Sequence, residues 1–115
     1  MLHQDLYMFC NNMYKINVPC EIFSNFSFDY SIYEKMPPNV TYVLSWHNIN
    51  NIKFIDNFNK IKDSDIDRYM FSIMFEHDNI DASINIYNII KKRTPFVAIY
   101  LIYDTAQYSK QYTSN

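Results

Sequence analysis

SDIDRYMFSIMFEH (residues 64–77) is the stretch on which the predicted fold depends most. Ser64 and Asp67 resemble a capping box with Asp in place of Glu, a pattern that begins helices. Apolar residues then recur three and four positions apart, as they do on one face of a helix. The pattern predicts a helix over 64–77, whose inner face comprises Ile66, Tyr69, Met70, Ile73, Met74 and His77.

A second helix is predicted over 80–93. Asp81 lies in its first turn and the run Lys91-Lys92-Arg93 at its end, where each charge interacts favourably with the helix dipole. The dipole therefore explains this basic cluster without a nucleic-acid site. Only the Asp78-Asn79 link separates the two helices, and so short a link predicts an antiparallel pair.

Short strands are predicted within 21–58, where EIFSNFSF (residues 21–28) and TYVLSW (residues 41–46) are rich in β-branched and aromatic residues. Another strand is predicted over 96–103, although Thr94-Pro95 is also compatible with the start of a helix. The chain contains no glycine, so its turns must use Asn, Asp and Pro. The expected corners are Asn11-Asn12, Asn50-Asn51 and Asp78-Asn79.

Together these elements predict an α+β fold. A small single-layer antiparallel or mixed sheet, with strands within 21–58 and 96–103, would pack against the antiparallel helices 64–77 and 80–93. The 115 residues are enough for one globular domain, 1–115. The polar residues 104–115 are expected to form a frayed C-terminal tail.

Two stretches raise the question of an internal repeat: VPCEIFSNFSF (residues 18–28) and MPPNVTYVLSW (residues 36–46), which begin eighteen residues apart. A true repeat would place Ile22 and Val40, and likewise Phe26 and Leu44, at equivalent positions of stacked strands. Two copies are too few to bury the continuous core of a solenoid. We therefore interpret them as two similar strands that follow proline turns.

Composition limits the classes of function. Ten Lys and Arg stand against twelve Asp and Glu, and so small a net charge disfavours binding to duplex DNA. No secretory signal is visible, and the longest apolar run, 95–103, is about half the ~20 residues of a membrane span. These features predict an intracellular, cytoplasmic protein with no membrane partner. The bias toward Ile, Asn, Tyr and Lys suggests an A+T-rich genome, such as that of a virus, a phage, a parasite or a low-G+C bacterium.

The sequence lacks the motifs of most known catalytic and ligand-binding sites. Without glycine, phosphate loops and dinucleotide fingerprints cannot form in the usual way, and no metal motif is present. We therefore expect no cofactor, no metal site and no catalytic residue. Cys10 and Cys20 are expected to be reduced, packed thiols. The alternative is a small hydrolase or nuclease that uses His47, His77 and a nearby acid.

The abundant aromatic residues favour a non-enzymatic protein-interaction module, because large amphipathic rings provide contact area at low entropy cost. Such a protein could act as an inhibitor or adaptor on a host protein, and a homodimer is compatible with the sequence. A second alternative is stacking of tyrosines on single-stranded nucleic acid, although no positive groove accompanies them. Trp46 can also be interpreted as a core residue. The predicted partner-binding residues are Trp46, His47, Tyr103, Tyr108 and Tyr112.

Overall fold

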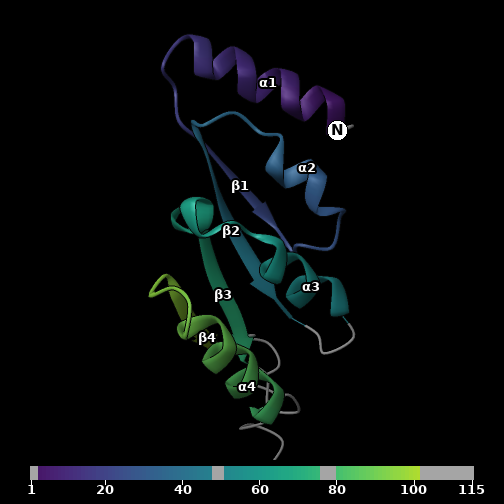
Figure 1. Cartoon of the computed structure of the whole chain (residues 1–115), viewed down its shortest axis with the longest axis vertical. Coiled ribbons are helices and arrows are strands. Elements are labelled where there is room, and N and C mark those ends of the chain that lie inside the picture. Colours follow the sequence, from purple (N-terminus) through teal and green to yellow (C-terminus); the bar gives the residue numbers. More distant parts are fainter. Residues whose placement is uncertain (1–2, 48–50, 76–79, 102–115) are drawn as a thin grey trace, which may run out of the picture.

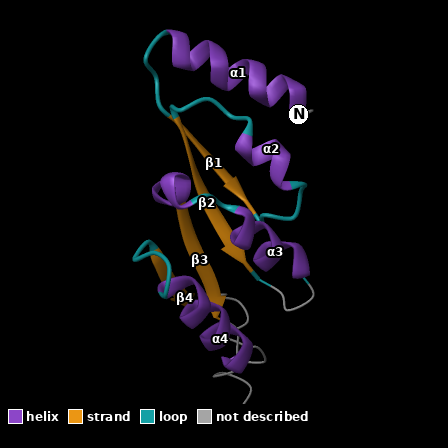
Figure 2. Cartoon of the chain, in the orientation of Figure 1, coloured by secondary structure: helices purple, strands orange, loops and turns teal. Residues whose placement is uncertain are grey.

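In the computed structural model, the part of the chain that is described contains four strands, which form one parallel sheet (Figures 1 and 2). They are β1 (Cys20–Ser24), β2 (Val40–Trp46), β3 (Tyr69–Phe75) and β4 (Val97–Leu101), and they lie side by side in that order. Each strand pairs in parallel with the next. The structure describes residues 3–47, 51–75 and 80–101.

Helices provide the connections that parallel strands require. α1 (His3–Lys15) precedes β1, α2 (Tyr30–Glu34) joins β1 to β2, and α4 (Ile80–Lys91) joins β3 to β4. The link from β2 to β3 contains α3 (Ile52–Lys60) and the 3-10 helix η1 (Asp63–Arg68). Crossovers between parallel strands are almost always right-handed, so strands added in one direction place their connecting helices on the same face. Within the described residues, no helix is both long and apolar enough to cross a membrane.

The core lies between the connecting helices and the face of the sheet that they cover. Tyr33 of α2 packs against Tyr42 of β2, with ring centroids 5.7 Å apart. Phe58 of α3 meets Phe71 of β3 edge to face at 5.3 Å. Inward positions alternate with outward ones along each strand, and those of β2 are all buried: Val40, Tyr42, Leu44 and Trp46.

Two polar side chains form hydrogen bonds between the segments that connect the strands. Arg93, just after α4, donates to the carbonyls of Phe58, at 2.6 Å, and Ile61, and its guanidinium lies 5.2 Å from the centre of the Phe58 ring. The helix dipole is therefore only part of the reason for a basic residue here. The buried amide of Asn57 donates to the carbonyls of Phe26, at 2.9 Å, and Phe28, at 2.7 Å. These bonds hold Phe26 at a φ of 60°, a conformation that is costly for a bulky residue.

The predicted α+β fold with an antiparallel or mixed sheet is wrong, because the sheet is entirely parallel and the fold is α/β. The decisive error concerns residues 64–77. Ser64 and Asp67 form no cap and lie inside η1, whose N-cap is Lys62 and which ends at Arg68. The apolar residues that follow form β3. The predicted antiparallel helix pair therefore does not exist. Short apolar runs in helices and in buried strands look alike, so periodicity alone cannot distinguish them.

Other predicted elements are confirmed. α4 is the helix predicted over 80–93, and β4 is the strand predicted over 96–103 as far as the structure describes it. The region 21–58 contains the predicted strands β1 and β2, but also the unpredicted helices α2 and α3. The corner predicted at Asn11-Asn12 lies inside α1, while Asn50 and Asp78-Asn79 lie outside the described residues. β1 and β2 pair Ile22 with Tyr42, not Val40, so their spacing is not that of the apparent repeat.

Candidate functional site

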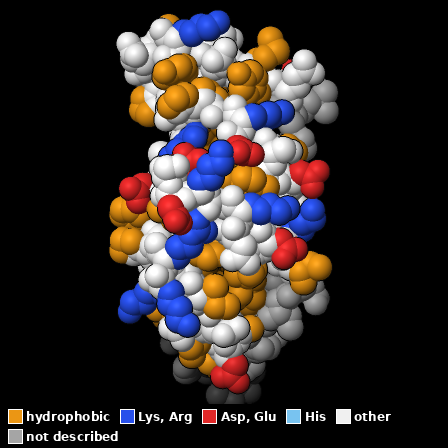
Figure 3. Space-filling model, viewed as in Figure 1, with side chains coloured by type: hydrophobic (Ala, Val, Ile, Leu, Met, Phe, Trp, Pro, Cys, Tyr) orange, Lys and Arg blue, Asp and Glu red, His pale blue; other side chains and the backbone are white. Residues whose placement is uncertain are grey.

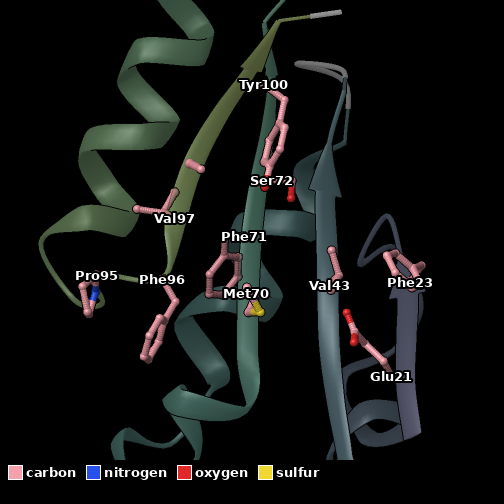
Figure 4. Close-up of a pocket in the computed structure, with 11 residues that line it drawn as sticks. Glu21, Phe23, Val43, Met70, Phe71, Ser72, Pro95, Phe96, Val97 and Tyr100 are labelled. Atoms are coloured by element: carbon pink, nitrogen blue, oxygen red, sulfur yellow. The ribbon is translucent and has the colours of Figure 1, made fainter.

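Within the part of the chain that the structure describes, the helices cover one face of the sheet only, and we call the other face the open face. Consecutive side chains of a strand point to opposite faces, so the residues between the core positions form this surface. Figure 4 shows side chains from all four strands, with Val43 between Phe23 and Met70. The described members of the open face are Glu21, Phe23, Thr41, Val43, Ser45, Met70, Ser72, Met74, Phe96, Ala98 and Tyr100.

An apolar row crosses the open face from one edge of the sheet to the other. The register pairs Phe23 with Val43, and Val43 with Met70. The N–H of Phe71 donates to the carbonyl of Phe96 at 2.9 Å, and this bond brings Phe96 next to Met70. The strands β1, β2 and β3 therefore each contribute one apolar side chain to the row, and Phe96, immediately before β4, contributes the fourth.

Four large side chains at the open face are well exposed, although Ser72 between them is buried. Phe23 is 73% exposed, Met70 50%, Phe96 44% and Tyr100 51%. At ~150–250 Å² per aromatic side chain, the three rings alone expose roughly 250–420 Å². The largest apolar patch on a typical monomer covers about 300–600 Å² and is often functional. The rings together with Met70 and Val43 make a patch of this kind.

A shallow depression of about 460 Å³ lies on the open face (Figure 4). Glu21 is the one charged residue among the eleven described residues that line it. The helix-covered side, seen in Figure 3, carries Lys, Arg, Asp and Glu side chains interspersed with apolar ones. The two sides of the molecule therefore differ in charge, and the open face is the apolar one. The depression is lined by Glu21, Phe23, Val43, Met70, Phe71, Ser72, Pro95, Phe96, Val97, Ala98 and Tyr100.

Of the five residues predicted to bind a partner, the structure describes only Trp46 and His47. Trp46 is 2% exposed and belongs to the core, as the alternative interpretation of this residue expected. His47 follows β2 and is exposed. Tyr103, Tyr108 and Tyr112 lie outside the described residues, so their role stays a prediction. The same holds for the hydrolase hypothesis, because His77 also lies outside them.

A second depression, of about 380 Å³, lies near the carboxyl end of β2, between α3 and α4. Ligands of open α/β sheets often bind at this end of the strands. Asp56 is the one titratable residue that lines it among the described residues, beside Asn51, Asn85 and apolar side chains. Across the described ranges, no group of three or more His, Cys, Asp or Glu side chains could hold a metal ion.

Cys10 and Cys20 are free thiols near each other, on α1 and β1. The amide of Asn39 donates to the carbonyl of Cys10 at 3.3 Å and contacts the sulfur of Cys20 at 3.7 Å. Burial, and secondarily the neighbouring Cys20 thiol, raises the pKa of the Cys10 thiol to about 11. Because the thiolate is the nucleophilic form, Cys10 is a poor nucleophile at neutral pH.

Comparison with known protein families, with curated proteins and with solved structures gave no match. Sequence reasoning missed the residues of the open face because the strand β3 was assigned to a helix. A signal was present, since TYVLSW and YMFSIMF have apolar side chains at both alternating sets of positions, as strands of parallel sheets do.

Proposed function

We propose that this chain is a protein-binding module and that the open face of its sheet is the contact surface. The observation that supports the proposal is the apolar row of Phe23, Val43, Met70 and Phe96 across an uncovered face. All-parallel sheets are almost always covered on both faces. A partner that lays an apolar surface, such as one side of an amphipathic helix, on the open face would supply the missing layer.

The composition of the open face favours a protein partner over a nucleic acid. Its rings could stack on unpaired bases, but proteins that bind single strands combine stacking with a positive groove. The described lining of the depression contains one carboxylate, that of Glu21, and no Lys or Arg. Protein interfaces, in contrast, are enriched in aromatic residues and Met and depleted of charge at their centre.

The exposed area of the open face is also appropriate for a protein interface. A standard interface buries about 800 Å² on each partner, and the three exposed rings supply about a third to a half of that area. Binding energy is usually concentrated in a few large side chains near the centre of an interface. Phe23 and Met70 are the best candidates, since both are half or more exposed and lie on different strands.

Site-directed photo-cross-linking tests this surface. A benzophenone amino acid is placed at position 23 in one variant and at position 52 in a control. Phe23 and Ile52 are both 73% exposed, but Phe23 lies on the open face and Ile52 on α3. Each variant is irradiated in a lysate of cells that make the protein, and adducts are identified by mass spectrometry.

We expect the position 23 variant to give one dominant adduct with a defined protein, and the position 52 variant to lack it. A further Met70→Ser substitution should weaken the adduct, because it removes another apolar side chain of the same row. Equal adduct patterns at the two positions would refute the open face as a binding surface. A cross-link within one chain, to residues 102–115, would show that the chain covers the face itself and would also refute the proposal.

A further inference from the structure

Among the described strands, none pairs with the outer edge of β4, which is a second candidate contact surface. Ile99 is 38% exposed, Tyr100 51% and Leu101 76%, so both faces of this strand carry exposed apolar side chains. Native edge strands are usually protected by charged residues, proline or bulges. The other edge strand follows this rule, because β1 has Glu21 within it. A proline precedes each edge strand, Pro19 before β1 and Pro95 before β4, but β4 has no charged residue or proline within Val97–Leu101.

The direction of the backbone groups on β4 follows from one hydrogen bond. The carbonyl of Phe96 accepts from the N–H of Phe71 on β3, so the backbone groups of Phe96 point inward. Successive strand residues alternate the direction of these groups within the plane of the sheet. Ala98 and Tyr100 therefore also point toward β3, whereas the N–H and C=O groups that point outward belong to Val97, Ile99 and Leu101.

We propose that this edge pairs with β4 of a second copy of the chain, in antiparallel orientation, with Ile99 opposite Ile99 of the other copy. In this register, the residues whose backbone groups point outward lie opposite one another in the two copies. They form the hydrogen-bonded pairs between the two β4 strands. Val97 then lies opposite Leu101, and the small Ala98 opposite the large Tyr100. No like charges meet, because the strand carries none.

The two-fold axis that relates the two copies would be perpendicular to the sheet. The open faces of the two copies would therefore lie on the same side of one eight-stranded sheet. Phe96 and Tyr100 of each copy would meet near its centre and extend the apolar surface. Pairing of one five-residue strand buries less than the area of a standard interface, so the dimer is transient and depends on concentration. The inference is independent of the proposed function, since it concerns the edge and not the open face.

Charge pairing at position 99 tests both the edge and the register. Ile99→Lys and Ile99→Glu each place like charges opposite one another at the axis, which destabilises a strand pair. Sedimentation velocity over a range of concentrations should show wild type shifting from monomer to dimer and each single variant remaining monomeric. An equimolar mixture of the two variants should restore the dimer, because Lys then faces Glu. Circular dichroism confirms that each variant is folded.

Two further variants distinguish the edge from other surfaces. Ile99→Pro removes an outward N–H without removing a bond to β3, so it should abolish the dimer if the strand stays intact. Ile52→Lys on α3 and Phe23→Ser on the open face should leave the dimer unchanged. A wild-type chain that stays monomeric throughout would overturn the inference. A dimer that survives in Ile99→Lys, or that is lost in Phe23→Ser, would also overturn it.

Discussion

Adjacent residues of β3 should differ sharply in their contribution to stability. Phe71 is 2% exposed and faces the helices, whereas Met70 is 50% exposed and lies on the open face. Phe71 makes edge-to-face contacts with Phe58 at 5.3 Å and Phe54 at 6.1 Å. We predict that Phe71→Ala is strongly destabilising and that Met70→Ala is not.

The expected magnitudes follow from burial. A buried ring removes ~150–250 Å² from water, which at ~25 cal/mol/Å² corresponds to about 4–6 kcal/mol. Phe→Ala substitutions in cores cost about 3–5 kcal/mol, so we expect a loss in that range for Phe71→Ala. Complete burial of a Met side chain contributes about 1.5–3 kcal/mol, and Met70 is only half buried. We therefore expect Met70→Ala to cost about 1 kcal/mol.

Urea unfolding measures both losses, and the buried Trp46, the single tryptophan of the chain, provides a fluorescence signal. The urea midpoint should fall far more in Phe71→Ala than in Met70→Ala, with similar slopes for the two variants. If residues 69–75 were helical, positions 69, 70, 73 and 74 would share a face and Met70 would be a core residue. Equal losses, or a larger loss for Met70→Ala, would refute the strand and the open face together.

Three further predictions concern the polar groups of the core. Asn57→Ala removes the amide that donates to the carbonyls of Phe26 and Phe28. Because these carbonyls lose their partner, the free energy of unfolding should fall by about 2–4 kcal/mol in thermal or urea unfolding. A loss below about 0.5 kcal/mol would contradict this role. Arg93→Gln should cost about 1–3 kcal/mol because it breaks bonds to Phe58 and Ile61, whereas Lys92→Gln, at an exposed neighbour, should change stability by less than about 0.5 kcal/mol. Burial raises the pKa of Cys10 from 9.0 to about 11 and also raises the pKa values of Tyr42 and Tyr69 above their ordinary 10.0. In alkali the unfolded chain therefore loses protons that the folded chain keeps. The contribution of these groups to folding stability is complete below about pH 9 and is lost as the pH rises toward the pKa values of the folded chain. Unfolding midpoints that stay constant from about pH 8 to pH 11 would contradict this.

The sequence identified several elements correctly but not the way they combine. The strand before Trp46 and the helix that begins near Ile80 were evident because each has flanking turn signals and a consistent apolar pattern. Parallel pairing could not be inferred, since it depends on helical connections and α3 was not recognised. Its Phe54 and Phe58 have the helical spacing of four residues, but the stretch is short and rich in Asn and Lys.

The candidate site was missed for a related reason. Phe23, Val43, Met70 and Phe96 are distant in sequence and become neighbours only through the register of four parallel strands. Trp46 and the C-terminal tyrosines are predicted to bind a partner because of their residue type alone. Residue type indicated that rings would make contacts, but exposure depends on which face of the sheet each side chain occupies. That choice is fixed by tertiary packing.

Solvent exposure of Met70, measured in the free chain and in a complex, tests whether the open face is an uncovered binding surface. Methionine methyl groups are labelled with ¹³C, and a soluble paramagnetic probe broadens the NMR signals that it can reach. Met8 on α1 is 54% exposed and Met36 is 4% exposed, so they serve as accessible and buried references. In the free chain we expect broadening of Met8 and Met70 but not of Met36. With the cross-linked partner added, Met70 should become protected while Met8 stays accessible; a Met70 signal protected in the free monomer, or still broadened in the complex, would mean that the open face is not the binding surface.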